Sequence, residues 1–349
     1  MKQTNPPNKT DGRRVLHRHK TISIVVPCYN EEDVLNLLFD RLSDAAEDWQ
    51  AAVEFILVDD GSTDRTWEII QDFNLRDSRW KAVRLARNMG HQTALWTGLR
   101  HASGDVIGVL DADLQDPPEV LPRMFAKWEQ GNDVVYGVRR KRKESPFRRL
   151  AYFAFYRLMS VVAEINIPLD SGDFCVMDRR VLEAMLRSKE INPYVRGIRA
   201  WVGYSQVGLA YERDARAAGA AKYTLRKLIE LATSGIFGFS TRPLRVASYL
   251  GIAVTSLSTL GGILMAVQWM LAGRLDFVDI AAPSPLAALA LALALLGGVQ
   301  LICMGILGEY VGRIYDNVKG RPLSIVRETL GLNAQQRERE NDGDRRKAA

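Results

Sequence analysis

Three aspartates and a glutamine lie close together in VLDADLQDPPE, residues 109–119. Asp111, Asp113 and Asp116 repel one another unless a metal ion, basic side chains or water lies between them. At positions i and i+2 of an extended strand end, Asp111 and Asp113 would project from the same face, and Gln115 could add a neutral oxygen. Mg²⁺ prefers oxygen ligands and commonly binds one or two carboxylates together with substrate phosphates. The D-x-D spacing alone is a weak signal, but together with two further polar clusters upstream it favours a Mg²⁺ site made by Asp111, Asp113 and Gln115.

The third aspartate of this stretch has a different neighbourhood. Asp116 is followed by Pro117 and Pro118, and proline is favoured in the first turn of a helix. We therefore expect Asp116 to cap the next helix and to play a structural role.

Two further polar clusters follow apolar runs, CYNEE at residues 28–32 and DDGSTD at 59–64. The second is compatible with an ordinary acidic turn, because Asp-Gly-Ser is common turn chemistry. Carboxylates at the carboxyl edge of a sheet can also accept hydrogen bonds from a ribose or a base. Three such clusters in one chain favour a shared ligand site over three unrelated turns.

The elements that would position these clusters alternate between strands and helices. Apolar, β-branched runs at 22–27 and 53–60 are typical of buried parallel strands, and the runs at 81–86, 105–113 and 133–139 indicate further strands. Amphipathic stretches at 31–47, 93–102 and 117–130 are typical of helices, and acidic residues crowd the first turn expected for 31–47. The pattern predicts an α/β sheet covered on both faces, with ligands beyond the carboxyl ends of its strands.

Composition adds limits to this picture. The chain has 349 residues, a formal net charge of +6 and three cysteines without metal or disulfide spacing, which fits a reducing compartment. Residues 1–20 are polar and basic, with no apolar core of a signal peptide, and residues 329–349 are highly charged. We expect both ends to be disordered tails.

The composition changes after residue 242. The ranges 246–273 and 280–308 carry no charged residue, and about 20 apolar residues suffice for a helix to cross a bilayer. We therefore expect two transmembrane helices, at about 246–272 and 284–308, within a membrane domain at 244–309. Residues 224–243 pair apolar positions with basic ones, which favours an amphipathic helix on the membrane surface over an ordinary domain helix.

Lys and Arg set the expected orientation. They are frequent in 213–245 and in 313–327, whereas the loop between the spans has Arg274 beside Asp276 and Asp279. The positive-inside rule then places both termini, the α/β domain and the segment 310–328 in the cytoplasm. The expected location is the inner (plasma) membrane, with two passes.

Five segments, taken in order, resemble glycosyltransferase family 2: VVPCYNEE, LVDDGSTD, RNMGHQTALWTGL, GDVIGVLDADLQDPPE and SGDFCVMDRR. Two C-terminal spans narrow the resemblance to the polyprenyl-phosphate glycosyltransferases, which include dolichol-phosphate mannose synthase and bacterial undecaprenyl-phosphate sugar transferases. The resemblance covers roughly residues 20–325. It implies a GT-A (Rossmann-like) catalytic domain at 21–223, followed by the two-helix transmembrane domain.

The resemblance also implies roles for single residues in nucleotide binding. Pro27, Tyr29 and Glu31 match the first nucleotide-contacting loop. Asp59 and Asp60 match the pair that faces the base and the ribose. The 111–115 cluster matches the metal and diphosphate site, so the implied cofactor is Mg²⁺ or Mn²⁺.

On the phosphate side, Arg139 matches an arginine that meets phosphate, and Asp173 matches an acidic active-site position; with Asp113 these are the expected catalytic residues. Arg216 and Lys222 match the basic pair of a closing loop near the membrane. The basic run 139–149 suits a phosphate or anionic headgroups, although most of it fits a solvated loop equally well. For the histidine in RNMGHQ, His91, a cleft position and a structural position are both open.

The closing loop departs from the family. The usual Gly-Glu-Ser-Lys-Tyr is here Gly219-Ala220-Ala221-Lys222-Tyr223, so a carboxylate and a hydroxyl are missing. This departure puts the identity of the donor in question, and to a lesser degree activity itself.

The expected function is inverting transfer of a sugar from a nucleotide-diphosphate donor, UDP-glucose or a UDP-N-acetylhexosamine, to undecaprenyl phosphate. A lipid phosphate is already ionised at neutral pH, so it needs positioning and charge neutralisation rather than a strong base. The alternatives are a processive polysaccharide synthase and a weakened scaffold subunit of a glycan-export complex. Expected partners are membrane lipids and further copies in a homotetramer, the latter from the resemblance, and no nucleic acid.

Overall fold

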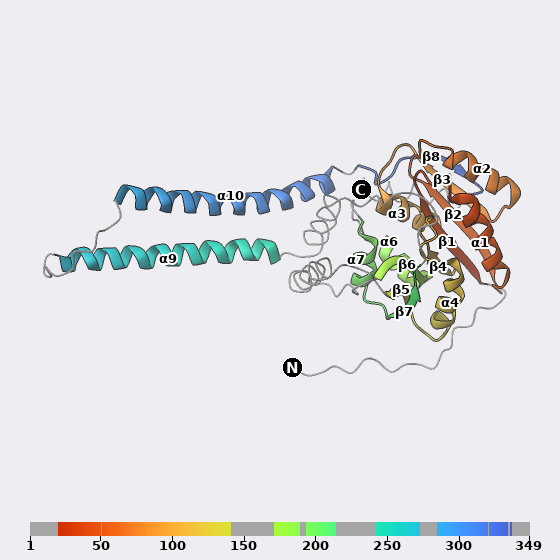
Figure 1. Cartoon of the computed structure of the whole chain (residues 1–349), viewed down its shortest axis with the longest axis horizontal. Coiled ribbons are helices and arrows are strands. Elements are labelled where there is room, and N and C mark those ends of the chain that lie inside the picture. The colour runs from red at the N-terminus through yellow and green to blue at the C-terminus, as the bar shows by residue number, and fades with distance from the viewer. Residues whose placement is uncertain are drawn as a thin grey trace. The chain divides into compact units, whose positions relative to one another are not determined.

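We describe a computed structural model of the chain, in which residues 20–49, 51–140, 171–188, 193–213, 242–272, 285–319, 321–333 and 336 are placed. These residues belong to two compact units, one built around a β-sheet and one around two long helices (Figure 1). Each unit is described by itself.

The first unit is organised by one mixed sheet, whose strands run in the order β7-β5-β6-β4-β1-β2-β3-β8. Strands β1 (Thr21–Cys28), β2 (Ala52–Asp59), β3 (Trp80–Leu85) and β4 (Val106–Val109) are mutually parallel. Strand β6 (Ser171–Asp178) is antiparallel to β4 and to β5 (Val134–Arg140), and β7 (Gln206–Glu212) runs parallel to β5. The arrangement is a GT-A-like α/β fold, as the sequence predicted.

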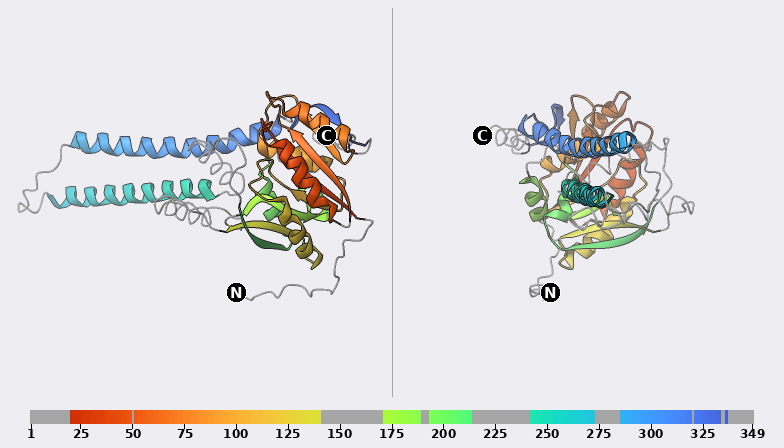
Figure 2. Two further views of the ribbon diagram at one scale, coloured as in Figure 1. Left: turned by 45° about the vertical axis from the view of Figure 1, so that its right-hand side comes forward. Right: turned by 90° about the vertical axis from the view of Figure 1, so that its left-hand side faces the viewer.

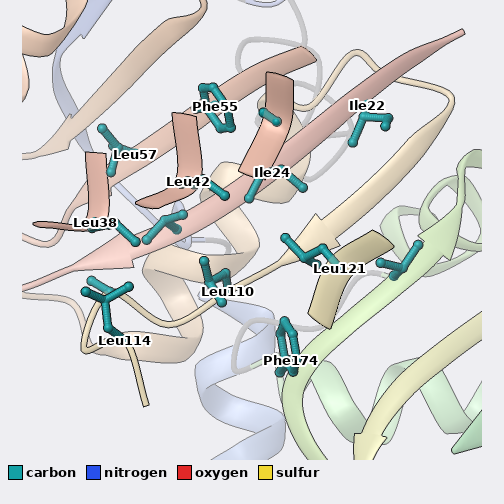
Figure 3. Packing of buried hydrophobic residues seen from close by; sticks show 14 of the residues in the cluster. Ile22, Ile24, Leu38, Leu42, Phe55, Leu57, Leu110, Leu114, Leu121 and Phe174 are labelled. Atoms are coloured by element: carbon teal, nitrogen blue, oxygen red, sulfur yellow. The ribbon is translucent and has the colours of Figure 1, made fainter. Parts of the chain in front are cut away.

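Helices cover both faces of the sheet. On one face α1 (Leu35–Glu47), α2 (Thr66–Arg76), the 3₁₀ turn η1 (Pro118–Val120) and α4 (Leu121–Glu129) enclose the main apolar core. Figure 3 shows Leu38 and Leu42 of α1 beside Ile24 of β1 and Leu57 of β2. The central strands have side chains buried on both sides, which explains their nearly uninterrupted apolar sequences.

On the other face lie α3 (His91–His101), α6 (Arg179–Leu186) and α7 (Val195–Trp201). Gly98 lets α3 approach the sheet closely, because a Cβ at this position would collide with the side chains of Val25 and Val58. Close packing brings the first residues of α3 to the carboxyl edge of the sheet, where the polar clusters lie.

The predicted strands and helices are present, with two local differences: β4 ends at Val109 instead of residue 113, and α1 begins after residue 31. Helix α1 begins at Leu35 and has no acidic residue in its first turn, because Glu31, Glu32 and Asp33 form the preceding turn. The Glu32 carboxylate accepts from the Arg65 amide of the neighbouring loop, and the Glu32 amide donates to Asp64, so this residue binds the loop instead of the helix end.

The structure also differs from the expected start of the C-terminal tail at residue 329. Strand β8 (Val326–Leu330) pairs antiparallel with β3, and both Leu332 and Gln336 are buried. The chain therefore returns to the edge of the sheet after the second long helix.

The second unit contains α9 (Arg242–Ala272) and α10 (Pro285–Val318), which run side by side (Figures 1 and 2). Both expected spans are helical, and α10 continues ten residues past its predicted end at 308. Within the described residues one segment, Leu295–Asp316 of α10, is long and apolar enough to cross a membrane, with a mean hydropathy of 1.5. A second span formed by α9 remains a prediction, and the expected surface helix, apart from residues 242–243, lies outside the described residues.

Candidate active site

The loops after β1 and β2 are joined by hydrogen bonds. Asn30 adopts a left-handed backbone conformation (φ 53°), its amide donates to Ser62 Oγ at 3.0 Å, and its side-chain oxygen accepts from the Thr63 amide at 2.9 Å. These bonds place Tyr29 and Glu31 partly exposed just past the carboxyl end of β1. Pro27, the third residue predicted there, is buried within β1.

The aspartate pair at the end of β2 braces neighbouring backbone. Asp60 accepts from the amides of Met89 (2.7 Å) and Gly90 (2.9 Å), whereas Asp59 accepts from the Ser62 amide at 3.0 Å and lies 3.3 Å from Arg84 Nε. Burial raises the pKa of Asp60, although the two amide hydrogen bonds oppose this shift. Both side chains are buried, so contact with a base and ribose remains a prediction.

The D-x-D stretch is a turn and not an extended strand end, because β4 already ends at Val109 and Leu114 has a φ of 54°. The side chains nevertheless alternate: Asp111, Asp113 and Gln115 are partly exposed, while Ala112, Leu114 and Asp116 are buried. Asp111, Asp113 and Gln115 therefore lie together on the outer side of the turn, as predicted. The conformation of the turn, and not the pleat of a strand, places them there.

The antiparallel direction of β6 brings Asp173 to this turn. The pairing of Val109 with Cys175 places the start of β6 at the carboxyl end of β4. Asp173 is 3 % exposed and makes a two-point ion pair with Arg196 of α7, at 2.8 Å to Nε and 3.0 Å to Nη2. Gln92 also donates to its Oδ2, at 3.1 Å.

A histidine lies between two of these carboxylates. His91 Nε2 is 3.4 Å from Asp173 Oδ2 and 3.7 Å from Asp111 Oδ1, so His91 lies beside two predicted site residues with its side chain partly exposed. Partial burial opposes protonation of the imidazole, but Asp173 and Asp111 outweigh it and raise the pKa of His91 to about 9. Burial would raise the pKa of Asp173, yet Arg196 and His91 hold it well below its usual range.

Asp111 is suited to a cation. Burial, followed by the nearby charges of Asp173, Asp116 and Asp113, raises its pKa to about 6 despite the opposing effect of His91. Its Oδ1 is buried and accepts no hydrogen bond from any described residue. An orphaned carboxylate oxygen among carboxylates fits a hard divalent ion, which would use Asp111, Asp113 and Gln115 as oxygen ligands. Within the described part of the chain, however, no three His, Cys, Asp or Glu side chains are already arranged as a metal-binding group.

The inner side of the turn binds basic residues. Asp116 is fully buried; its Oδ1 accepts from Tyr211 Oη and from Arg213 Nε (3.3 Å), and its Oδ2 is 3.6 Å from Arg139 Nη2. The expected helix cap is wrong, because Pro117 occupies the N-cap of η1 and no side chain caps it. Asp116 is structural in another sense: it joins the D-x-D turn to β5 and β7.

Several contributors were not foreseen from the sequence. Arg196, Gln92, Tyr211 and Arg213 contact predicted site residues, but they lie on elements whose direction depends on sheet order. Arg196 lies in RGIRAW, and Tyr211 and Arg213 lie in YERD, two polar stretches without a recognised motif, whereas Gln92 lies in the family segment RNMGHQTALWTGL. Arg216, Lys222 and the Ala220-Ala221 departure lie outside the described residues, as does the basic run beyond residue 140.

Comparison with known proteins identifies the family of this chain. The family model described as glycosyl transferase family 2 matches residues 23–186, which contain every strand-end cluster. A Bacillus subtilis (strain 168) protein described as the uncharacterized glycosyltransferase YkcC is 44% identical over 318 residues, covering 91% of this chain and 96% of that protein. The chain belongs to glycosyltransferase family 2.

Relatives of this glycosyltransferase include an SfII prophage-derived bactoprenol glucosyl transferase from Shigella flexneri, 38% identical over 88% of this chain and 98% of that protein. Among solved structures, glucosyl-3-phosphoglycerate synthase from Mycobacterium tuberculosis covers 67% of this chain and 82% of its own, at 18% identity and a TM-score of 0.47. That last likeness is too low to bear on the site.

Proposed function

We propose that this glycosyltransferase moves a sugar from a nucleotide-diphosphate donor to a polyprenyl phosphate at the cytoplasmic membrane face, with inversion at the sugar. UDP-glucose is the first donor to test, followed by UDP-N-acetylhexosamines. The observation that carries the proposal is similarity along nearly the whole chain, 88% of it, to a protein described as a bactoprenol glucosyl transferase. The apolar segment Leu295–Asp316 supports a substrate that resides in a membrane.

The site supports chemistry on an acceptor that is already ionised. Asp173 is a buried acidic side chain near Asp111, but its two oxygens are held by Arg196, and its low pKa makes it a poor proton acceptor. A phosphate acceptor does not need to lose a proton to become nucleophilic. Asp173 would then orient Arg196 and His91, and both bear positive charge near neutral pH at the edge where the substrates meet.

Charge on the departing nucleoside diphosphate has to be neutralised as the sugar leaves. A divalent ion at Asp111, Asp113 and Gln115 would supply Lewis-acid stabilisation of that charge. Arg139 offers a planar guanidinium for two-point contact with phosphate oxygens. Turnover should therefore depend on Mg²⁺ or Mn²⁺.

The test is transfer of radiolabelled glucose from UDP-glucose to undecaprenyl phosphate by purified protein, with UDP-N-acetylhexosamines in parallel and product masses as readout. Asp113→Ala should lower turnover by at least about a hundredfold, because an oxygen ligand and its charge are lost. Asp40→Ala is the matched control, since Asp40 is an exposed aspartate on α1. Unchanged turnover in Asp113→Ala contradicts the metal assignment, and absence of lipid-linked sugar with every donor contradicts the proposed function.

A further inference from the structure

The buried carboxylate on the inner side of the D-x-D turn has more basic neighbours than its own charge requires. Asp116 faces two guanidinium groups, those of Arg139 and Arg213, as well as the Tyr211 hydroxyl. One carboxylate beside two arginines leaves positive charge on the inner side of the turn, whereas Asp111 and Asp113 on its outer side carry the opposite charge. The inner side therefore suits an anion and the outer side a cation.

The register of the sheet explains why these groups meet. Arg139 and Tyr211 are direct partners in the parallel β5–β7 pair, and Arg213 follows the end of β7. Gly137 makes room for the Tyr211 ring, because a Cβ there would lie 2.7 Å from Tyr211 Cε1. With the ring in that space, its hydroxyl reaches Asp116, and burial together with the Asp116 charge raises the pKa of Tyr211, which keeps it a donor.

Two arginines in this region are held in different ways. Arg196 is fully engaged, because its Nε and Nη2 both donate to Asp173. Arg139 is held less completely: its Nη2 is 3.6 Å from Asp116 Oδ2, its guanidinium also interacts with the Tyr211 hydroxyl, and its buried Nε has no hydrogen-bond partner among the described residues. A guanidinium that is oriented but has unused donors is suited to two-point binding of an oxyanion.

We propose that Asp116 is a positioning residue that holds Arg139 and Arg213 toward a phosphate group of a substrate. Asp116 lies on the same turn as Asp111 and Asp113. This one short segment therefore positions both the predicted metal-binding carboxylates and the arginines. The phosphate belongs either to the nucleotide donor or to the lipid acceptor. This inference rests on the proposed function for its substrates, but not for the orientation of the arginines.

The kinetic test compares Asp116→Asn and Tyr211→Phe with the wild-type enzyme, measuring KM separately for UDP-glucose and for undecaprenyl phosphate. We expect KM to rise about tenfold in Asp116→Asn for the substrate whose phosphate the arginines bind, with a smaller change in kcat. Tyr211→Phe removes one of the bonds to Asp116 and should shift the same KM in the same direction, by less. The substrate whose KM rises identifies the source of the phosphate.

Glu54→Gln is the control for lost stability, because Glu54 is a buried, hydrogen-bonded carboxylate near the start of β2, far along the strand from Asp59. It should leave both KM values unchanged. Both KM values of Asp116→Asn within twofold of wild type, or a matching KM rise in Glu54→Gln, overturns the proposal.

A second measurement does not depend on activity. Phenylglyoxal labelling followed by peptide mass spectrometry reports how tightly each arginine is held. Asp116→Asn should speed labelling of Arg139 and Arg213 several-fold while leaving Arg196, held by Asp173, at its wild-type rate. The positioning role is overturned if the labelling rates of Arg139 and Arg213 are the same in Asp116→Asn as in the wild-type protein. This outcome can be read even if the protein transfers no sugar to lipid.

Discussion

At the scale of single residues, two arginines on α7 differ in whether a carboxylate balances their charge. Asp173 and Arg196 form a two-point pair with little access to water. Arg199, one helical turn further along α7, is 1 % exposed, forms no ion pair within the described residues and has the neutral Cys175 thiol as a polar neighbour. Its guanidinium carbon lies 5.7 Å from the centre of the Tyr136 ring, a cation–π contact. A buried charge without an ionic partner destabilises a fold. Removing one member of a buried ion pair is also destabilising, because the other member becomes a buried charge without a partner.

This contrast predicts opposite outcomes for two similar substitutions. Arg196→Met should lower the free energy of unfolding by about 1–3 kcal/mol, because Asp173 would lose its two-point partner and keep only His91 and Gln92. Arg199→Met should cause no loss, since it removes an uncompensated charge and keeps the side-chain volume. Chemical denaturation of both variants in detergent measures the difference. An equal loss in the two would show that Arg199 has a stabilising partner.

At the scale of elements, β8 pairs with β3 at the edge of the sheet, and Gln336 beyond it binds near the start of β2, at the opposite end of the strands from the site. Gln336 donates to Glu54 Oε2 (3.2 Å) and to the His101 carbonyl (2.9 Å), and its Oε1 is 3.4 Å from Lys81 Nζ. Glu54 also accepts from Ser23 and Ser103. Burial would raise the pKa of Glu54, but Lys81, Ser23 and Ser103 together lower it.

The lowered pKa of Glu54 has a defined consequence for acid stability. A carboxylate with a folded-state pKa below its unfolded value contributes stability above the unfolded value, near 4.5, and loses it as the pH falls through the folded value. Glu54→Gln should therefore be less stable than wild type at pH 7, and the difference should shrink below about pH 4.5. Thermal unfolding across pH measures this, with the exposed Glu47→Gln as control. A difference independent of pH would contradict the ionic role of Glu54.

At the scale of the whole molecule, charge outside the apolar segments sets the expected topology. The range 273–284 between α9 and α10 holds Arg274 as its sole basic residue, whereas Lys and Arg are frequent on both flanks of the helices. Two spans with cytoplasmic ends would place that range outside the cell.

Cysteine labelling of intact cells tests this topology. In a variant without Cys303, a cysteine at Phe277 should react with a membrane-impermeant maleimide, and one at Arg87, an exposed residue of the first unit, should react only after the cells are opened. Protection of Phe277→Cys, or prompt labelling of Arg87→Cys, would contradict two passes with an internal catalytic domain.

The sequence by itself determined the central parallel strands, the two long helices, the family and the outward-facing set Asp111, Asp113 and Gln115. These follow from local apolar patterns and short motifs, which do not depend on distant parts of the chain. Tertiary structure decided the rest. Asp173, Arg139 and Arg213 reach the turn because β6 runs antiparallel between β4 and β5, and because β7 adds parallel to β5. Asp116 changed from an expected helix cap into a buried partner of two arginines, because its partners are about 20 to 100 residues away in sequence and meet it only through the order of the strands.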